Sequence, residues 1–88
     1  MRKSYEELQH MLTSASEQIK LGSEWVHYKN PDKKYEVKEF VIIESTQVVG
    51  VVYESEDNPG IKFMRPLDEF FDNVKFEGET VKRFRHIN

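Results

Sequence analysis

The spacing of apolar residues along the chain changes near Gly22, and this change limits the folds that the sequence can adopt. Before Gly22, apolar residues recur every three or four positions, which is typical of one face of an α-helix. These residues are Tyr5, Leu8, Leu12, Ala15 and Ile19. From Trp25 onward, apolar and polar residues alternate in short runs separated by turn-forming residues, as in β-strands. The 88 residues are one domain long. We therefore predict a single domain, 1–88, with a helix and lead-in over 1–21 and a β unit over 22–88.

A capping motif marks the start of the predicted helix. Ser4 and Glu7 form the Ser-x-x-Glu pattern, in which the serine hydroxyl and the glutamate carboxylate each accept a hydrogen bond from an amide of the first turn. This pattern predicts a helix over about residues 4–17. A second Ser-x-x-Glu pattern follows directly after Thr13 and predicts that the helix breaks and restarts near that residue.

Alternating runs separated by turn signals predict a series of short strands after the helix. The predicted strands cover residues 25–28, 35–44, 47–53, 61–64, 74–76 and 81–84. The Asn30–Lys33 segment predicts the first turn, a slip in the alternation near Lys38 predicts a β-bulge, and Gly50 predicts a close approach or a sharp bend. Pro66 suits the first position of a short helix. We expect Phe70 of this helix to pack into the core. These elements predict a mainly β (α+β) fold, a small bent SH3-like β barrel or roll with an N-terminal helix and one short helical turn.

Composition narrows the expected environment and partners of the protein. The chain contains no cysteine, which excludes disulfides and thiolate metal sites. It has no apolar run of the kind that a signal peptide or a membrane span needs, so we expect a cytoplasmic protein with no membrane partner. The net charge of −3 argues against general coating of nucleic acid, but a basic run near the C-terminus allows a local basic patch. This run consists of Lys82, Arg83, Arg85 and His86.

An ordered set of fragments in the β unit is similar to a known family. The fragments are Gly22-x-x-Trp25-x-His27-Tyr28-Lys29, Tyr35-x-Val37, Val51-Val52-Tyr53, Met64-Arg65-Pro66, Phe70 and Arg83-Phe84. Over residues 22–84 the chain resembles the bacterial and phage "domain of unknown function 1653" family, and this resemblance implies a compact β fold with no established activity. The chain departs from the family's pattern at Asn30, where the family usually has Gly, and at Lys82, where it often has Pro. The N-terminal helix looks like an addition to the family's pattern.

Six residues of the β unit form the candidate binding site. They are Trp25, His27, Lys29, Tyr53, Arg65 and Arg83. The arginines, the lysine and the histidine suit an anionic ligand, and the tryptophan and the tyrosine offer flat rings on which a base could stack. We therefore predict a non-enzymatic binding module with a basic and aromatic groove for an anionic ligand, which is nucleic acid, a peptide or a small anion. In the alternative interpretation, the arginines pair with carboxylates and only stabilise the fold.

Two other functions remain open from the sequence. One face of the helix carries Tyr5, Leu8, Met11 and Leu12. This face either packs on an open end of the barrel or binds a partner or a second copy of the chain, so that the protein is a structural or protein-interaction domain and a monomer or homodimer. A small nucleotide-directed enzyme would use His27 as a base and Arg65 to stabilise charge, but no catalytic motif supports a reaction. Three scattered histidines and the lack of cysteine predict neither a metal nor a cofactor.

Overall fold

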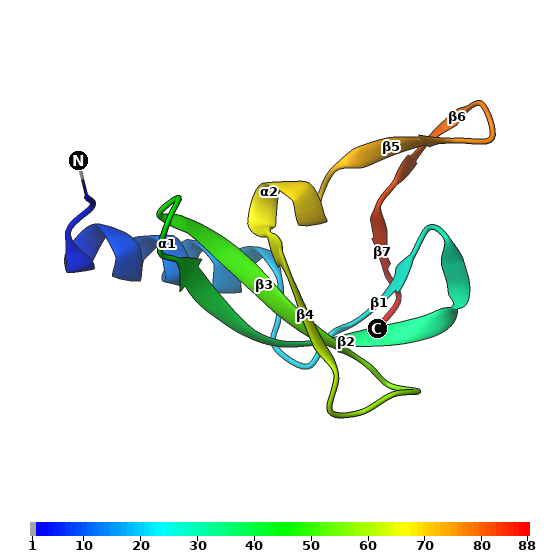
Figure 1. Ribbon diagram of the computed structural model, residues 1–88, viewed down its shortest axis with the longest axis horizontal. Coiled ribbons are helices and arrows are strands. Elements are labelled where there is room, and N and C mark those ends of the chain that lie inside the picture. The colour runs from blue at the N-terminus through cyan, green and yellow to red at the C-terminus, as the bar shows by residue number, and fades with distance from the viewer. Residues whose placement is uncertain (1) are drawn as a thin grey trace.

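The computed structural model describes residues 2–88 and is built around a five-stranded antiparallel sheet (Figure 1). Its elements are α1 (Tyr5–Gln18), β1 (Glu24–His27), β2 (Asn30–Ile43), β3 (Val48–Ser55), β4 (Lys62–Pro66), α2 (Leu67–Phe70), β5 (Asn73–Phe76), β6 (Glu79–Lys82) and β7 (Phe84–His86). The main sheet has the strand order β4-β3-β2-β1-β7, while β5 and β6 form a separate hairpin. α1 packs against β2 and β3, and α2 packs against β3 and β4. The predicted mainly β, α+β class is confirmed.

The N-terminal helix α1 is uninterrupted and begins at the predicted cap. The Ser4 hydroxyl accepts a hydrogen bond from the amide of Glu7 (3.1 Å), and the Glu7 carboxylate accepts one from the amide of Ser4 (3.2 Å). The predicted break near Thr13 is wrong, because the Thr13 hydroxyl donates to the carbonyl of Gln9 (3.0 Å) and is satisfied within the helix. Ala15, which is fully buried, lies on the face that packs against the sheet. No helix among residues 2–88 is long and apolar enough to cross a membrane.

The first hairpin turns earlier than the sequence predicts. β1 and β2 are joined at residues 28–29, so the predicted turn at Asn30–Lys33 is wrong. That segment instead forms an irregular start of β2, in which the register with β1 shifts between Val26 and His27. The irregularity accommodates Pro31, because a proline has no amide to donate to a neighbouring strand.

Two irregularities in the β2–β3–β4 part of the sheet agree with the sequence. The register of β2 against β3 shifts between Val37 and Glu39, which confirms the predicted bulge. Gly50 of β3 lies so near its neighbours that a Cβ atom would be 2.7 Å from the sulfur of Met64 and 3.2 Å from Cγ1 of Ile43. The predicted close approach at Gly50 is therefore confirmed, and the missing side chain lets β4 pack tightly against β3.

The sheet is open and does not close into the predicted barrel. Within residues 2–88, β4 and β7 form the two edges of the sheet and do not pair with each other. The cause lies at Arg83, where the strand predicted over residues 81–84 divides into β6 and β7. β6 pairs with β5 away from the main sheet, so no strand joins the two edges. The predicted short helix is present as α2, and its Phe70, 1% exposed, covers the open side by stacking on Phe84 with 4.3 Å between ring centroids.

The hydrophobic core lies beneath α2 and is rich in aromatic rings. The core residues are Ile19, Trp25, Val37, Val51, Tyr53, Phe70 and Phe84. The rings of Trp25 and Phe70 meet edge to face at 5.1 Å, and those of Tyr53 and Phe84 do the same at 5.1 Å. Large rings bury much area per residue, which allows so short a chain to stabilise an open sheet.

Candidate functional site

The six residues of the predicted site fall into two groups in the structure. Trp25 and Tyr53 belong to the core, where they are 9% and 7% exposed. The Trp25 indole N–H donates to the hydroxyl of Ser23 (2.9 Å), which satisfies its polar atom inside the protein. Tyr53 borders a small hollow of 160 Å³ that it shares with His27. Both rings are therefore committed mainly to packing, and the remaining four residues form the polar part of the site.

These four residues, His27, Lys29, Arg65 and Arg83, come from three distant parts of the chain, and we call them the arginine cluster. His27 ends β1 and Lys29 follows it in the turn, while Arg65 lies in β4 and Arg83 lies between β6 and β7. The charges of the other three members act together on the His27 ring. Arg83 lies next to the His27–Lys29 segment, because the amide of Tyr28 donates to the carbonyl of Arg83 (3.0 Å), and Arg65 is near enough for its charge to act on His27.

His27 is held as a neutral ring at the centre of the cluster. Burial lowers the pKa of its imidazole below the usual value of 6.5, and the positive charges of the other three members lower this pKa further. The amide of Lys29 donates to Nδ1 of His27 (3.2 Å), so in the neutral ring the proton is on Nε2. The ring also packs edge to face on Phe84, with 5.1 Å between centroids. His27 therefore presents one hydrogen-bond donor, Nε2–H, and no positive charge of its own.

The two arginines are half-buried, and in each the Nη atoms and the Nε atom differ in their contacts. An Nη atom of Arg65 lies 3.3 Å from the Glu69 carboxylate, and an Nη atom of Arg83 lies 3.9 Å from the Asp72 carboxylate. These contacts agree with the alternative interpretation, in which the arginines hold α2 and its surroundings in place. However, the Nε atom of each arginine is buried and has no hydrogen-bond partner among residues 2–88. Because a buried N–H group without a partner is costly, each arginine has a donor left to satisfy.

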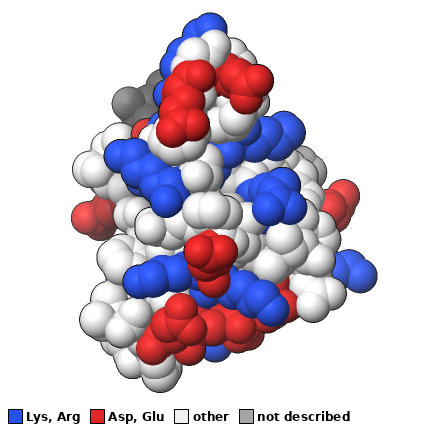
Figure 2. Space-filling view, turned by 90° about the vertical axis from the view of Figure 1, so that its right-hand side faces the viewer, with Lys and Arg blue, Asp and Glu red and all other residues white. Residues whose placement is uncertain are grey.

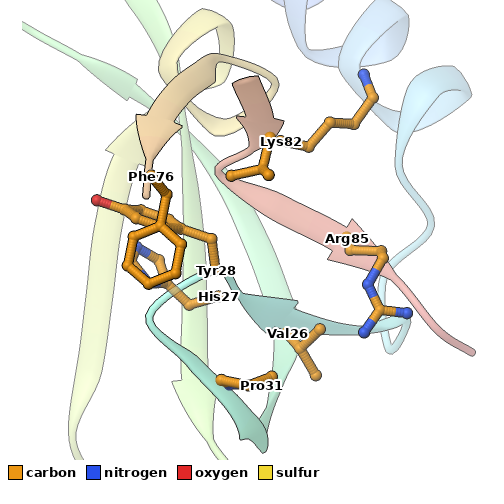
Figure 3. A pocket seen from close by; sticks show the side chains of 8 residues that line it. Val26, His27, Tyr28, Pro31, Phe76, Lys82 and Arg85 are labelled. Carbon is orange, nitrogen blue, oxygen red and sulfur yellow. The ribbon is translucent and has the colours of Figure 1, made fainter. Parts of the chain in front are cut away.

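A larger cleft, which the sequence did not predict, lies between the β1–β2 turn and the β5–β6 hairpin. We call this cleft of 420 Å³ the hairpin cleft. It is lined by Val26, His27, Tyr28, Pro31, Phe76, Val81, Lys82 and Arg85. Figure 3 shows the rings of His27, Tyr28 and Phe76 on one side of the cleft and Arg85 on the other. Because His27 belongs to both, the hairpin cleft and the arginine cluster are neighbours.

The sequence analysis noted several residues that line this cleft, but it did not group them into one site. The basic run near the C-terminus supplies Lys82 and Arg85, and Phe76 was assigned only to a predicted strand. The ring of Phe76 meets that of Tyr28 edge to face at 5.3 Å. This contact joins residues far apart in the sequence, so local alternation does not reveal it.

Charged side chains are unevenly placed over the end of the molecule that carries the β5–β6 hairpin. Figure 2 faces this end and shows Lys and Arg side chains on both sides of its middle, with an acidic group between them just below the centre and further Asp and Glu side chains toward the upper and lower edges. None of the residues that line the hairpin cleft is an aspartate or a glutamate. The cleft is therefore a locally basic place on a protein whose net charge is −3.

Comparison with known proteins gives one match. A family model described as "Protein of unknown function (DUF1653)" matches residues 23–86. The resemblance seen over residues 22–84 is therefore confirmed. No curated protein and no solved structure matches the chain. Among residues 2–88, no group of three or more His, Cys, Asp or Glu side chains is placed to hold a metal ion.

Proposed function

The chain belongs to the DUF1653 family of proteins of unknown function, and from its own geometry we propose that it is a non-enzymatic module that binds an anionic ligand at the arginine cluster. The ligand we propose is nucleic acid, whose phosphates supply the anionic groups. One observation carries this proposal: two arginines from distant segments act with their charges on one histidine, and each has a buried Nε donor without a partner among residues 2–88.

The donors of the cluster suit a phosphate group. A guanidinium presents several N–H groups in one plane and binds phosphate oxygens in pairs. The Nη contacts to Glu69 and Asp72 leave each Nε without a partner among residues 2–88, and because this atom is buried, a phosphate reaches it only when the arginine side chain moves. His27 adds an uncharged donor, which contributes a hydrogen bond without adding to the repulsion among the cations. Contacts of this kind position a nucleic-acid backbone without reading its sequence.

We assign His27 a binding role rather than a catalytic one. A general base needs a free lone pair within reach of the substrate. The Nδ1 atom of His27 already accepts a hydrogen bond from the amide of Lys29, and Nε2 carries the proton in the neutral ring. The ring can therefore donate to an anion, but it has no free acceptor with which to remove a proton.

The proposal is tested by titrating the full chain with short single-stranded RNA and DNA of mixed sequence while amide chemical shifts are recorded. We expect saturating shifts centred on His27, Lys29, Arg65 and Arg83, and an affinity that falls as salt is added. Arg65→Ala should lower the affinity roughly tenfold or more. Arg2→Ala is the matched control, because Arg2 is an exposed arginine whose partner is Glu44 on the surface.

Two results would contradict the proposal. One is an equal effect of Arg65→Ala and Arg2→Ala on affinity, and the other is the absence of any shift at low salt. Thermal unfolding of each variant shows whether the fold is intact. Arg65→Lys keeps the charge but removes the planar donor group, so it should recover only part of the affinity. Inorganic phosphate, titrated in parallel, reports whether the cluster binds the anion alone.

A second candidate function, a protein-interaction domain that acts through α1, is favoured by one observation. Tyr5 is 90% exposed at the start of the helix. The other three residues of the predicted docking face, Leu8, Met11 and Leu12, are half-buried, in agreement with a helix that packs on the sheet. We therefore place this function second.

A further inference from the structure

The hairpin cleft has a lining that differs from that of the arginine cluster. Three rings, of His27, Tyr28 and Phe76, form one side, and uncharged side chains of Val26, Pro31 and Val81 contribute most of the rest. Its volume of 420 Å³ lies within the range of about 300–1,000 Å³ typical of small-molecule sites. Such a lining suits a flat, mostly apolar group rather than a bare anion.

The pairing of strands also places a positive charge beside this apolar lining. β7 pairs with β1 so that Arg85 stands opposite Val26, and side chains opposite each other in a sheet point to the same face. Arg85 and Lys82 form no ion pair with any of residues 2–88. The cleft contains no carboxylate either. An apolar group that enters the cleft therefore meets unpaired positive charge at its margin.

The edge-to-face contact of Tyr28 and Phe76 leaves one of the two rings with neither face covered by the other. The rings of Tyr28 and Phe76 meet at 77° with 5.3 Å between their centroids, so one ring presents its edge to the face of the other. Phe76 is 37% exposed, so part of its side chain is open to solvent. Exposed rings beside positive charge are the means by which proteins bind single strands, because bases stack on the rings while cations meet the phosphates.

We propose that the hairpin cleft binds one unpaired base of a single-stranded nucleic acid, stacked on the ring of Phe76 beside Tyr28, while Arg85 binds the adjoining phosphate. This inference rests on the proposed function, because the neighbouring phosphate of the same strand would be bound at the arginine cluster. His27 borders both places and so lies where the strand passes from one to the other. A duplex does not fit this arrangement, because its bases are already stacked on each other.

The test measures binding of the full chain to a labelled single strand of about ten nucleotides by fluorescence anisotropy. An abasic strand of the same length has the same phosphates but no bases. Phe76→Leu keeps an apolar side chain but removes the flat ring, and we expect it to weaken binding of the normal strand about five- to tenfold. The same variant should leave binding of the abasic strand unchanged. Arg85→Gln should weaken binding of both strands.

Lys75→Gln is the matched control, because it removes one positive charge, as Arg85→Gln does, and alters the same hairpin as Phe76→Leu. Lys75 precedes Phe76 in β5, but it does not line the cleft, because neighbouring residues of a strand point to opposite faces. We expect Lys75→Gln to have a smaller effect than Arg85→Gln. Amide spectra of Phe76→Leu show whether the hairpin still packs against the β1–β2 turn.

The outcomes separate this inference from the proposed function. If Arg65→Ala weakens binding and Phe76→Leu weakens only the base-containing strand, both hold. If Arg65→Ala weakens binding but Phe76→Leu acts equally on both strands or on neither, the cleft does not hold a base and only the proposed function remains. If neither strand binds, both are overturned. If an acidic peptide binds in the cleft and the nucleic acid does not, the cleft is a peptide site and both are again overturned.

Discussion

His27 is the residue at which the arginine cluster and the hairpin cleft meet. Its Nδ1 atom is occupied by the amide of Lys29 and its ring packs on Phe84, so the ring has one orientation and one free donor. Its neutrality follows from burial and from the three nearby cations. A neutral ring among cations is a state that depends on pH, and this dependence can be measured.

We predict that His27 makes the protein less stable in mild acid. Because its pKa is lower in the folded protein than the unfolded value of about 6.5, the unfolded chain binds a proton more readily, and stability rises with pH in this region. The stability present above pH 6.5 is therefore lost progressively as the pH falls below that value. His27→Gln, which keeps a donor but does not titrate, should reduce this loss. Thermal unfolding of both proteins, measured from neutral pH to about pH 5.5, checks the prediction.

A matched comparison isolates His27 from the other histidines. His10→Gln removes an exposed histidine in α1 and serves as the control. If the melting temperatures of all three proteins fall in parallel with pH, His27 does not have the lowered pKa, and its assignment as a neutral donor is wrong. A direct titration of the ring signals by NMR gives the same answer for each residue.

At this scale, the two rings that the sequence predicted as stacking surfaces are buried, whereas the role of the predicted charged residues stays a prediction. The residue types of Arg65 and Arg83 predicted an anion site, and in the structure the charges of both lower the pKa of His27. Trp25 was expected to offer a stacking surface, yet its indole N–H finds a partner in Ser23 and the ring is buried. Burial of a ring depends on contacts between distant segments, so alternation along one strand does not determine it.

The β5–β6 hairpin is the element that decides the shape of the candidate site. The amide of Arg83 donates to the carbonyl of Asp72 (2.8 Å) and closes the base of the hairpin, and the amide of Tyr28 in the β1–β2 turn donates to the carbonyl of Arg83 (3.0 Å) and joins this base to the turn. Its turn has positive φ at both central residues, Glu77 (53°) and Gly78 (81°). Positive φ at both positions is the requirement of a type I′ turn, for which Asn-Gly is the preferred sequence.

We predict that Glu77→Asn stabilises the hairpin. A glutamate at positive φ is strained, whereas asparagine adopts this conformation readily, so the gain should be about 0.5 kcal/mol. Amide hydrogen exchange of β5 and β6 should become slower while that of β3 stays the same. Glu79→Asn is the control, because Glu79 lies within β6 and has no positive φ. Equal effects of the two substitutions would show that charge, rather than backbone conformation, is responsible.

The same hairpin explains why the fold was predicted only in part. Local signals gave the helix cap, the bulge after Val37 and the close approach at Gly50, because each depends on neighbours in the sequence or on the lack of a side chain. The predicted barrel required the last strand to join the two sheet edges, and this strand divides at Arg83. The partner of a short strand depends on contacts between distant segments. Local alternation in the sequence therefore did not predict that the strand over residues 81–84 divides into β6 and β7.

At the scale of the whole molecule, the two candidate interaction regions lie far apart. The molecule measures 41 × 30 × 22 Å along its principal axes. Figure 1 shows the start of α1 at one end of the long axis and the β5–β6 hairpin toward the other. A change in α1 should therefore alter the stability of the protein without altering ligand binding at the hairpin cleft, since sites this distant and without shared partners act independently.

We predict that Leu12→Ala lowers stability but leaves nucleic-acid affinity unchanged. Leu12 is half-buried on the face of α1 that packs against β2 and β3, so its truncation should cost about 1 kcal/mol and lower Tm by roughly 4–8 °C. Tyr5→Ala is the control: Tyr5 is 90% exposed, and its removal should change neither Tm nor affinity.

Sedimentation of both variants over a range of concentrations tests the second candidate function. If Tyr5→Ala converts a dimer into a monomer, α1 is an interaction surface. If both variants and the unmodified chain sediment as monomers, α1 does not mediate self-association, and its half-buried face serves to cover the sheet.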